Sequence, residues 1–196
     1  MYKKTRASLA GIILLTMMAL ATIAGSGTAS AAASGRAGFV AEAREAGLST
    51  KQATGLQSKV DTYLTKLAGK GTQVSPNQID LKGAVLNVAV PGEGRPRQLG
   101  AVRPAVDNAA QCSPTADYYW FCAYQNAYRG GDNIGMYSCG AYPIPWFTTG
   151  SWENNQTRGT VPTAYFTDGS TWRMPGAYYY ASAGVNWSPV TQIVNC

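Results

Sequence analysis

The chain has 196 residues, 45% of them hydrophobic, and a formal net charge of +6 without a single histidine. The lack of histidine excludes Ser-His-Asp and Cys-His nucleophiles and HExxH zinc sites, and leaves carboxylates, lysine and tyrosine as candidate catalytic groups. Residues 112–196 hold three arginines against four acidic residues, a near-neutral balance that argues against nucleic-acid binding.

Residues 1–31 have the pattern of a secretory signal peptide, with a basic start, an apolar run and small residues around Ala31. We predict cleavage after Ala31, with Ala33 as the alternative. A membrane anchor is the other interpretation, but the apolar run is shorter than the roughly 20 residues that span a bilayer. Cleavage removes three of the 16 basic residues and leaves 13 against 10 acidic ones. We therefore expect a secreted, extracellular protein whose mature form does not span a membrane.

Residues 32–90 form a predicted leader segment of helix and β-hairpin. A short helix is predicted around residues 39–46, and a clearer one begins at Ser49, whose side chain can cap the helix while Gln52 reaches back. Apolar residues at helical spacing then form a stripe that ends before Gly69, composed of Ala53, Leu56, Val60, Tyr63, Leu64 and Leu67. Two β-like runs, 79–81 and 84–90, follow, and we expect the apolar stripe of the helix to pack on them. Because the unit is small, we expect it to dock on the following domain or to serve in folding or export.

Residues 91–111 are rich in Pro, Gly and Arg, which predicts a linker. From Cys112 the composition changes, because 18 aromatic residues and no lysine occur up to Cys196. Short β-like runs at 120–124, 134–138, 163–167 and 177–181 alternate with turn clusters at 129–132, 153–155, 168–170 and 175–176. This spacing predicts a mainly β domain, a sandwich of Greek-key type, over residues 112–196.

The four cysteines, Cys112, Cys122, Cys139 and Cys196, predict two disulfides in an extracytoplasmic domain. Spacing alone permits three pairings. Of these we expect Cys112–Cys122 and Cys139–Cys196, which would tie the start of the domain and join its end to a central strand.

Several segments resemble secreted bacterial proteins of the metalloproteinase-inhibitor family with a beta/gamma-crystallin-like fold. They are Phe121-Cys122-Ala123-Tyr124, Tyr128 with Gly130-Gly131, Tyr137-Ser138-Cys139-Gly140, Trp152 and Asn154-Asn155-Gln156-Thr157. The resemblance implies two Greek-key halves over residues 112–196. Relatives of this fold often bind calcium after an Asn/Asp pair, but here Arg158 takes the place of a serine and opposes a cation. We therefore expect no cofactor and no metal.

The resemblance implies inhibition of an extracellular protease by a monomer, since a rigid loop loses little entropy when it binds. There are two candidate inhibitory loops. The first contains two stiffening prolines and comprises Tyr142, Pro143, Ile144, Pro145, Trp146 and Phe147. The second is residues 172–178. The aromatic residues of the first loop are equally explained by packing.

The alternative function is a carbohydrate or cell-envelope binding module. Two aromatic trios are candidate stacking platforms, namely Tyr118, Tyr119 and Trp120, and Tyr178, Tyr179 and Tyr180. Because alternate residues of a strand face opposite sides, at least one residue of each trio should be buried.

An enzyme is the third interpretation. Paired carboxylates from Asp132, Glu153 and Asp168 could cleave a glycosidic bond. All three lie in turn-like sequences, where acids usually bond to the backbone. We therefore expect no enzyme activity and no catalytic residue.

Overall fold

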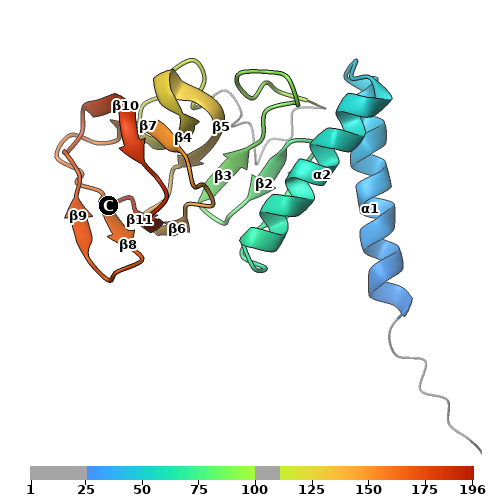
Figure 1. Cartoon of the computed structure of the whole chain (residues 1–196), viewed down its shortest axis with the longest axis horizontal. Coiled ribbons are helices and arrows are strands. Elements are labelled where there is room, and N and C mark those ends of the chain that lie inside the picture. The colour runs from blue at the N-terminus through green and yellow to red at the C-terminus, as the bar shows by residue number, and fades with distance from the viewer. Residues whose placement is uncertain (1–25, 100–110) are drawn as a thin grey trace, which may run out of the picture.

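The computed structural model describes residues 26–99 and 111–196, and for residues 26–34 only the backbone (Figure 1). Most of the predicted signal peptide therefore lies outside the described residues, apart from 26–31, which form part of α1. Within the described parts of the chain, no helix combines the length and apolarity needed to cross a bilayer.

Two helices, α1 (Ser26–Glu45) and α2 (Thr50–Lys66), pack side by side at one end of the molecule (Figure 1). The predicted capping box is confirmed: the Ser49 side chain accepts from the backbone N–H of Gln52, whose own side chain accepts from the Ser49 N–H. The first helix is much longer than the predicted 39–46. An ion pair of 3.1 Å between Arg36 and Asp61 joins the two helices.

The apolar stripe of α2 is buried as predicted, except for Leu64, which is partly exposed. It faces three short strands, β1 (Thr72–Ser75), β2 (Gln78–Asp80) and β3 (Ala84–Asn87). Strand β1 was not predicted, because its sequence TQVS is polar. The chain turns between β2 and β3 at Lys82 and Gly83, where the sequence predicted a break between the two runs. Both residues have positive φ, as a tight two-residue hairpin turn requires.

These strands continue into the C-terminal half of the chain, because β3 pairs antiparallel with β5 (Gly130–Met136). Three more strands complete a seven-stranded sheet of order β1-β2-β3-β5-β4-β7-β10, namely β4 (Trp120–Asn126), β7 (Thr149–Asn155) and β10 (Tyr179–Asn186). The sheet thus runs across the boundary that the sequence analysis placed at residues 91–111. Of the two expected roles of the leader, docking is the one observed.

A row of apolar side chains crosses this sheet on one face. Paired residues on successive strands are Ile79, Leu86, Ile134, Ala123, Trp152 and Ala181. The first five belong to one buried core cluster, against which Ala181 packs, and the cluster also includes most of the stripe of α2 and residues of a second sheet. Helix α2 therefore covers one end of this face, and the second sheet covers the other.

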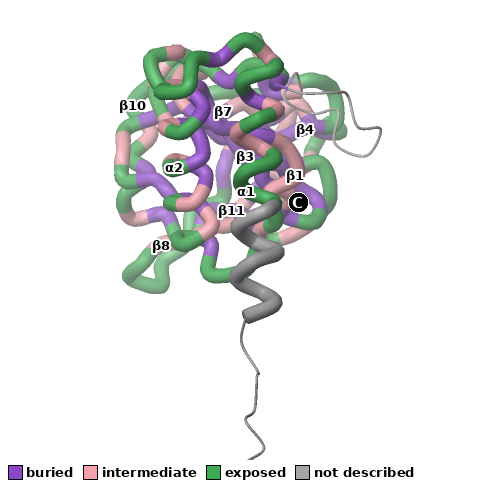
Figure 2. Tube along the Cα trace, turned by 90° about the vertical axis from the view of Figure 1, so that its right-hand side faces the viewer, coloured by how far each residue is buried: buried purple, intermediate pink, exposed green. Residues whose placement is uncertain are grey.

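The second sheet has four strands in the order β6-β11-β8-β9. They are β6 (Ala141–Pro143), β8 (Thr163–Phe166), β9 (Thr171–Arg173) and β11 (Val190–Val194). Ala164, Ile193 and Val190 supply its buried contacts to the core. The predicted fold class is confirmed: the protein is mainly β, two antiparallel sheets face each other, and buried residues lie along the strands between them (Figure 2).

The disulfides join Cys112 to Cys122 and Cys139 to Cys196, with Cα atoms 5.8 Å and 5.4 Å apart. This is the expected pairing. Two predicted turns are wrong: residues 153–155 lie inside β7, and residues 130–132 of the predicted turn 129–132 lie inside β5, because the chain reverses three residues earlier, in the short helix Ala127–Arg129. The Asn154 side chain is buried in β7 and donates to the carbonyl oxygens of Thr160 and Pro175, so its polarity serves the interior and does not mark a turn.

Candidate functional site

The segment predicted as the inhibitory loop lies largely inside the molecule. Tyr142, Ile144 and Trp146 are at most 6% exposed, Pro145 is buried, and Pro143 pairs with β11. Helix α2 holds the segment, since Trp146 Nε1 donates to the Tyr63 hydroxyl at 3.0 Å and Lys66 Nζ donates to the Pro145 carbonyl at 3.3 Å. Only Phe147, 74% exposed, presents its ring to solvent. Packing therefore explains most of this segment.

The first aromatic trio occupies a loop that the Cys112–Cys122 disulfide closes. Tyr118 and Tyr119 are 47% and 59% exposed at the tip of the loop, whereas Trp120 is buried as expected at the start of β4. Residues 112–122 are called the disulfide loop below.

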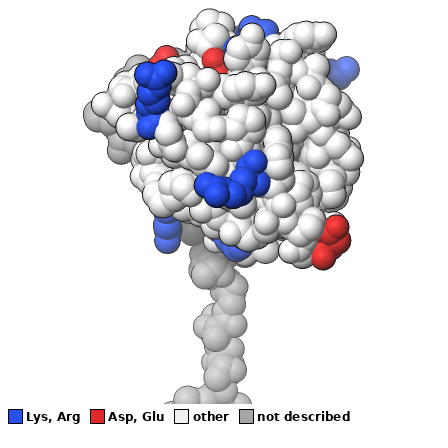
Figure 3. Space-filling model, turned by 90° about the vertical axis from the view of Figure 1, so that its left-hand side faces the viewer, with Lys and Arg blue, Asp and Glu red and all other residues white. Residues whose placement is uncertain are grey.

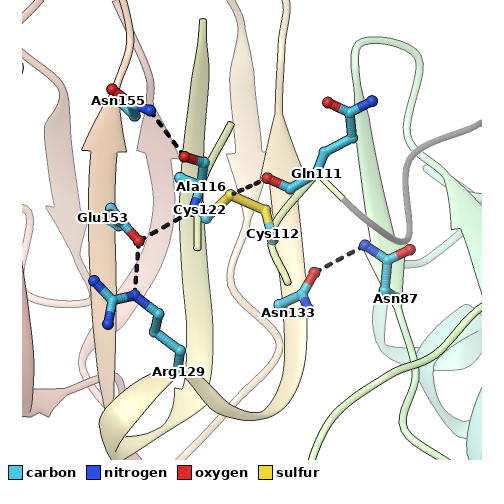
Figure 4. The surroundings of a disulfide bond; sticks show 9 residues. All are labelled: Asn87, Gln111, Cys112, Ala116, Cys122, Arg129, Asn133, Glu153 and Asn155. Atoms are coloured by element: carbon cyan, nitrogen blue, oxygen red, sulfur yellow. Dashed lines mark hydrogen bonds and ion pairs between the residues drawn. A yellow bond between two sulfur atoms is a disulfide. The ribbon is translucent and has the colours of Figure 1, made fainter. Parts of the chain in front are cut away.

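Hydrogen bonds fix the disulfide loop to β7 (Figure 4). The Ala116 N–H donates to Glu153 at 3.0 Å, while Asn155 Nδ2 donates to the Ala116 carbonyl at 2.8 Å. The Tyr119 N–H donates to the Asn155 carbonyl at 2.9 Å. Strand β7 thus holds both the middle of the loop and the backbone of its tip.

Two further features keep the disulfide loop close to the sheet. Gly135 lies beneath it, and a Cβ there would lie 2.9 Å from Cys112 Sγ and from the Trp120 ring, so glycine permits the close approach. Glu153 is held by Arg129, with 2.7 Å between Arg129 Nε and Glu153 Oε2. This hydrogen bond raises the pKa of Arg129, which stays charged. The carboxylate is therefore fixed as an acceptor for the loop.

The second trio meets the first in space, although about 60 residues separate them in sequence. The Tyr118 ring lies 6.2 Å from that of Tyr178, and 3.9 Å from that of Tyr119. Neighbouring rings are inclined by 40° and 42°, so they do not share a plane. The tyrosine surface, as we call it, consists of Tyr118, Tyr119 and Tyr178.

The expected burial of one residue in the second trio is wrong, since Tyr178, Tyr179 and Tyr180 are all more than half exposed. The reason is that β10 (Tyr179–Asn186) is the last strand of the seven-stranded sheet and Tyr178 comes just before it, so the trio lies at the edge of the sheet. Tyr179 lies 6.0 Å from the Trp152 ring on the core side, while Tyr180 lies 5.5 Å from the Arg129 guanidinium on the other. The trio therefore does not form one platform.

The three candidate catalytic acids sit in separate structural contacts. Asp132 is fully buried in β5 and meets Lys59 of α2 at 2.7 Å, the Tyr63 hydroxyl and the Ala89 N–H. Asp168 accepts from the backbone and side chain of Ser170 in a turn, which lowers its pKa. Glu153 is held by Arg129. Each of the three acids thus binds a different set of groups, and in these contacts no acid is paired with another.

Few charges interrupt the end of the molecule formed by β8, β9 and β10, which is mostly white in Figure 3. The sequence analysis expected the Cys112–Cys122 disulfide and named Tyr118 and Tyr119 as candidate binding residues, but it did not predict that β7 holds the loop that joins them. The meeting of Tyr118 with Tyr178 had no local signal, because it depends on the order of β4, β7 and β10 in the sheet.

No protein-family model matches the chain, and comparisons with curated proteins and with solved structures find no significant match. The resemblance to metalloproteinase inhibitors therefore stays a prediction.

Proposed function

We propose that the protein is a secreted protease inhibitor that acts through the disulfide loop instead of residues 142–147. One observation carries this proposal: two exposed tyrosines stand on a loop closed by a disulfide and held by hydrogen bonds to β7. A loop already ordered in the free protein loses little entropy on binding. Tyrosine is also among the residues that most often dominate binding energy at protein interfaces.

The loop backbone constrains the mode of binding. Tyr119 has a φ of +76°, which is incompatible with an extended strand through the tip. The loop would therefore block a cleft through its side chains, with Tyr118 and Tyr119 as anchors, and would not lie in the active site as an extended substrate does.

The inclination of the rings also bears on the alternative function. A flat polysaccharide surface is best matched by coplanar rings, whereas Tyr118, Tyr119 and Tyr178 are tilted by about 40° to their neighbours. Tilted rings with polar edges suit the irregular surface of a protein. This supports a protein partner over a polysaccharide at the tyrosine surface.

Titration of the oxidised protein against a thermolysin-like metalloprotease and a subtilisin-like serine protease tests the proposal. We expect stoichiometric inhibition of one of them. Tyr118→Ala should weaken inhibition roughly 30-fold, which is about 2 kcal/mol. Tyr165→Ala removes a partly exposed tyrosine of β8, outside the tyrosine surface, and should leave inhibition unchanged.

Phe147→Ala separates the disulfide loop from residues 142–147. If it abolishes inhibition while Tyr118→Ala has no effect, residues 142–147 carry the activity and the disulfide loop does not. If neither protease is slowed at micromolar protein, these two protease classes are not targets and inhibition as proposed here fails.

A further inference from the structure

Tyr119 occupies a backbone position that seldom carries a tyrosine. The Trp120 N–H donates to the Asp117 carbonyl at 3.2 Å and closes a tight turn, in which Tyr119 is the third residue and has a φ of +76°. In a type II turn this position requires positive φ and normally holds glycine or asparagine. A bulky side chain with positive φ is sterically unfavourable. The tyrosine therefore makes its own turn less stable.

The order of the loop does not depend on the Tyr119 ring. The residue is 59% exposed. The backbone of the turn is fixed without the ring, by the Cys112–Cys122 disulfide and by the hydrogen bond of 2.9 Å from the Tyr119 N–H to the Asn155 carbonyl. Strained backbone positions of this kind are concentrated at functional sites. A side chain that costs stability and is not needed to order its loop indicates a role in binding.

The two tyrosines of the disulfide loop have different surroundings. The Tyr118 ring lies between two others, that of Tyr119 at 3.9 Å and that of Tyr178 at 6.2 Å. Among the described residues, the Tyr119 ring meets only that of Tyr118, so it stands at the end of this row. A ring at the end of a row is free to enter a pocket of a partner. A ring flanked on two sides is suited to lie against the rim of that pocket.

The charge of the disulfide loop restricts the kind of pocket. Its only charged residue is Asp117, which is exposed and lies two positions before Tyr119. Proteases that select lysine or arginine carry an acidic group in the specificity pocket, which would meet a neutral ring and a like charge here. Proteases that select small residues have a pocket too narrow for a tyrosine. An apolar pocket of aromatic width is the one that fits.

We infer that Tyr119 selects the target protease, by entering an uncharged, apolar pocket that accepts large aromatic side chains. Tyr118 and Tyr178 lie against the rim of this pocket. The inference rests on the proposed function, because it concerns the same site, and it adds the specificity class of the enzyme. The partner is a protease that prefers aromatic or large apolar residues over basic or small ones.

Inhibition constants against proteases with different pockets test the inference. The probes are the subtilisin-like and thermolysin-like enzymes, whose pockets are apolar, and a trypsin-like enzyme, whose pocket is acidic. We expect the oxidised protein to inhibit one of the first two and to leave the trypsin-like enzyme active. Tyr119→Gly should weaken this inhibition roughly 100-fold, because glycine keeps the turn and only the ring is lost.

Tyr128→Gly is the matched control. Tyr128 is also an exposed tyrosine with positive φ, 70% exposed with a φ of +57°, and it lies between β4 and β5, at the other end of β4 from Tyr119. Glycine adopts positive φ without steric cost. Neither variant should therefore unfold at a lower urea concentration than the parent protein. Only Tyr119→Gly should lose inhibition.

Tyr119→Arg gives a readout that a structural role would not change. A guanidinium group at this position suits the acidic pocket of the trypsin-like enzyme. We expect Tyr119→Arg to inhibit that enzyme and to inhibit the original target less than the parent does. Tyr118→Arg should not inhibit the trypsin-like enzyme, because its side chain lies at the rim.

Four results overturn the inference. They are equal inhibition by Tyr119→Gly and the parent, equal loss in Tyr119→Gly and Tyr128→Gly, a lower urea midpoint for Tyr119→Gly, and no inhibition of the trypsin-like enzyme by Tyr119→Arg. Inhibition of the trypsin-like enzyme by the parent protein overturns it as well, while the proposed function stands. If the parent inhibits none of these proteases, the proposed function fails, and the inference fails with it.

Discussion

Asp132 illustrates at the scale of single residues how the two halves of the chain are joined. Its side chain is fully buried, and its donors come from Lys59 and Tyr63 of α2 and from the backbone of Ala89. The Tyr63 hydroxyl in turn accepts from Trp146. A charge in such a position is tolerated only while its partners are present. The network therefore makes the position of α2 on the sheet specific.

Replacing Lys59 with methionine should lower the free energy of unfolding by about 2–3 kcal/mol. The full cost of breaking a buried pair, about 3–5 kcal/mol, is reduced because the Lys59 side chain is one-third exposed. Urea unfolding measures the change. Lys51→Met, at an exposed position of the same helix, is the control and should stay within about 0.5 kcal/mol of the parent. A similar loss in both variants would show that the charge pair is unimportant.

Alkaline pH should destabilise the protein through its buried tyrosines. Burial, and then the charge of Asp132, raises the pKa of Tyr63 above its ordinary value of 10.0, and burial raises the pKa of Tyr124 in the same direction. In the unfolded chain these hydroxyls ionise near pH 10, so the folded state retains more protons above that pH and loses stability as pH rises. Each tyrosine contributes a slope of up to about 1.4 kcal/mol per pH unit.

Unfolding free energies measured from pH 8 to 11 check this expectation. Below pH 10 both tyrosines should contribute their full stability. Tyr63→Phe has no proton to lose, so its curve should be flatter above pH 10 than that of the parent. Identical slopes would indicate that Tyr63 is accessible to solvent in the native state.

At the scale of elements, the two disulfides have different tasks. Cys139–Cys196 spans 57 residues and ties the end of β11 to the segment before β6, whereas Cys112–Cys122 spans ten and closes the disulfide loop. In the chain-entropy account, the longer loop restricts the unfolded state more. Cys139–Cys196 should therefore matter more for stability, and Cys112–Cys122 more for binding.

Serine variants of each pair separate these tasks. Cys139→Ser with Cys196→Ser should cost about 4 kcal/mol, and Cys112→Ser with Cys122→Ser about 3 kcal/mol. Protease inhibition should fall more in the variant without Cys112–Cys122, because its loop loses order. A larger loss of inhibition in the variant without Cys139–Cys196 would contradict the placement of the site on the disulfide loop. Denaturant unfolding and inhibition assays on both variants provide the comparison.

Sequence patterns predicted an element well where residues close together in the chain determine it. Ser49 and Gln52 marked the start of α2 because a capping box needs only residues three positions apart. Glu153 and Asn154 were misread as a turn because the partners that satisfy them, such as Arg129 and Pro175, are distant in sequence. The exposure of Tyr178–Tyr180 likewise follows from the edge position of β10, which no local window contains.

The whole molecule is held together by one sheet that draws strands from both halves. Because β3 lies between β2 and β5, removing residues 26–99 would expose the row that contains Ile134 and Ala123. The composition of residues 112–196 predicted the β architecture of that half, but the pairing of β3 with β5 was beyond pattern analysis, since hydrophobic alternation identifies a strand and not its neighbour.

A fragment of residues 112–196 alone should fail to unfold cooperatively, and should bind a hydrophobic dye through the uncovered sheet face. Refolding it together with a fragment of residues 32–99 should restore near-ultraviolet circular dichroism and a single unfolding transition. A cooperative transition in the isolated C-terminal fragment would show that the leader is dispensable for folding. The control is the fragment of residues 112–196 refolded alone under the same conditions.

The position of β3 also has a consequence during biosynthesis. Ribosomes release the chain from its N-terminus, so β3 emerges well before β5, and its residues, AVLN, are all buried in the finished protein and carry no charge. In that interval the nascent chain presents an unpaired, uncharged strand edge that can pair with another copy. Asp80 and Lys82, immediately before β3, place charges where gatekeeper residues limit such association. The order in which the strands are synthesised thus leaves β3 able to associate with other chains until β5 has been made, although both of its edges are paired in the folded protein.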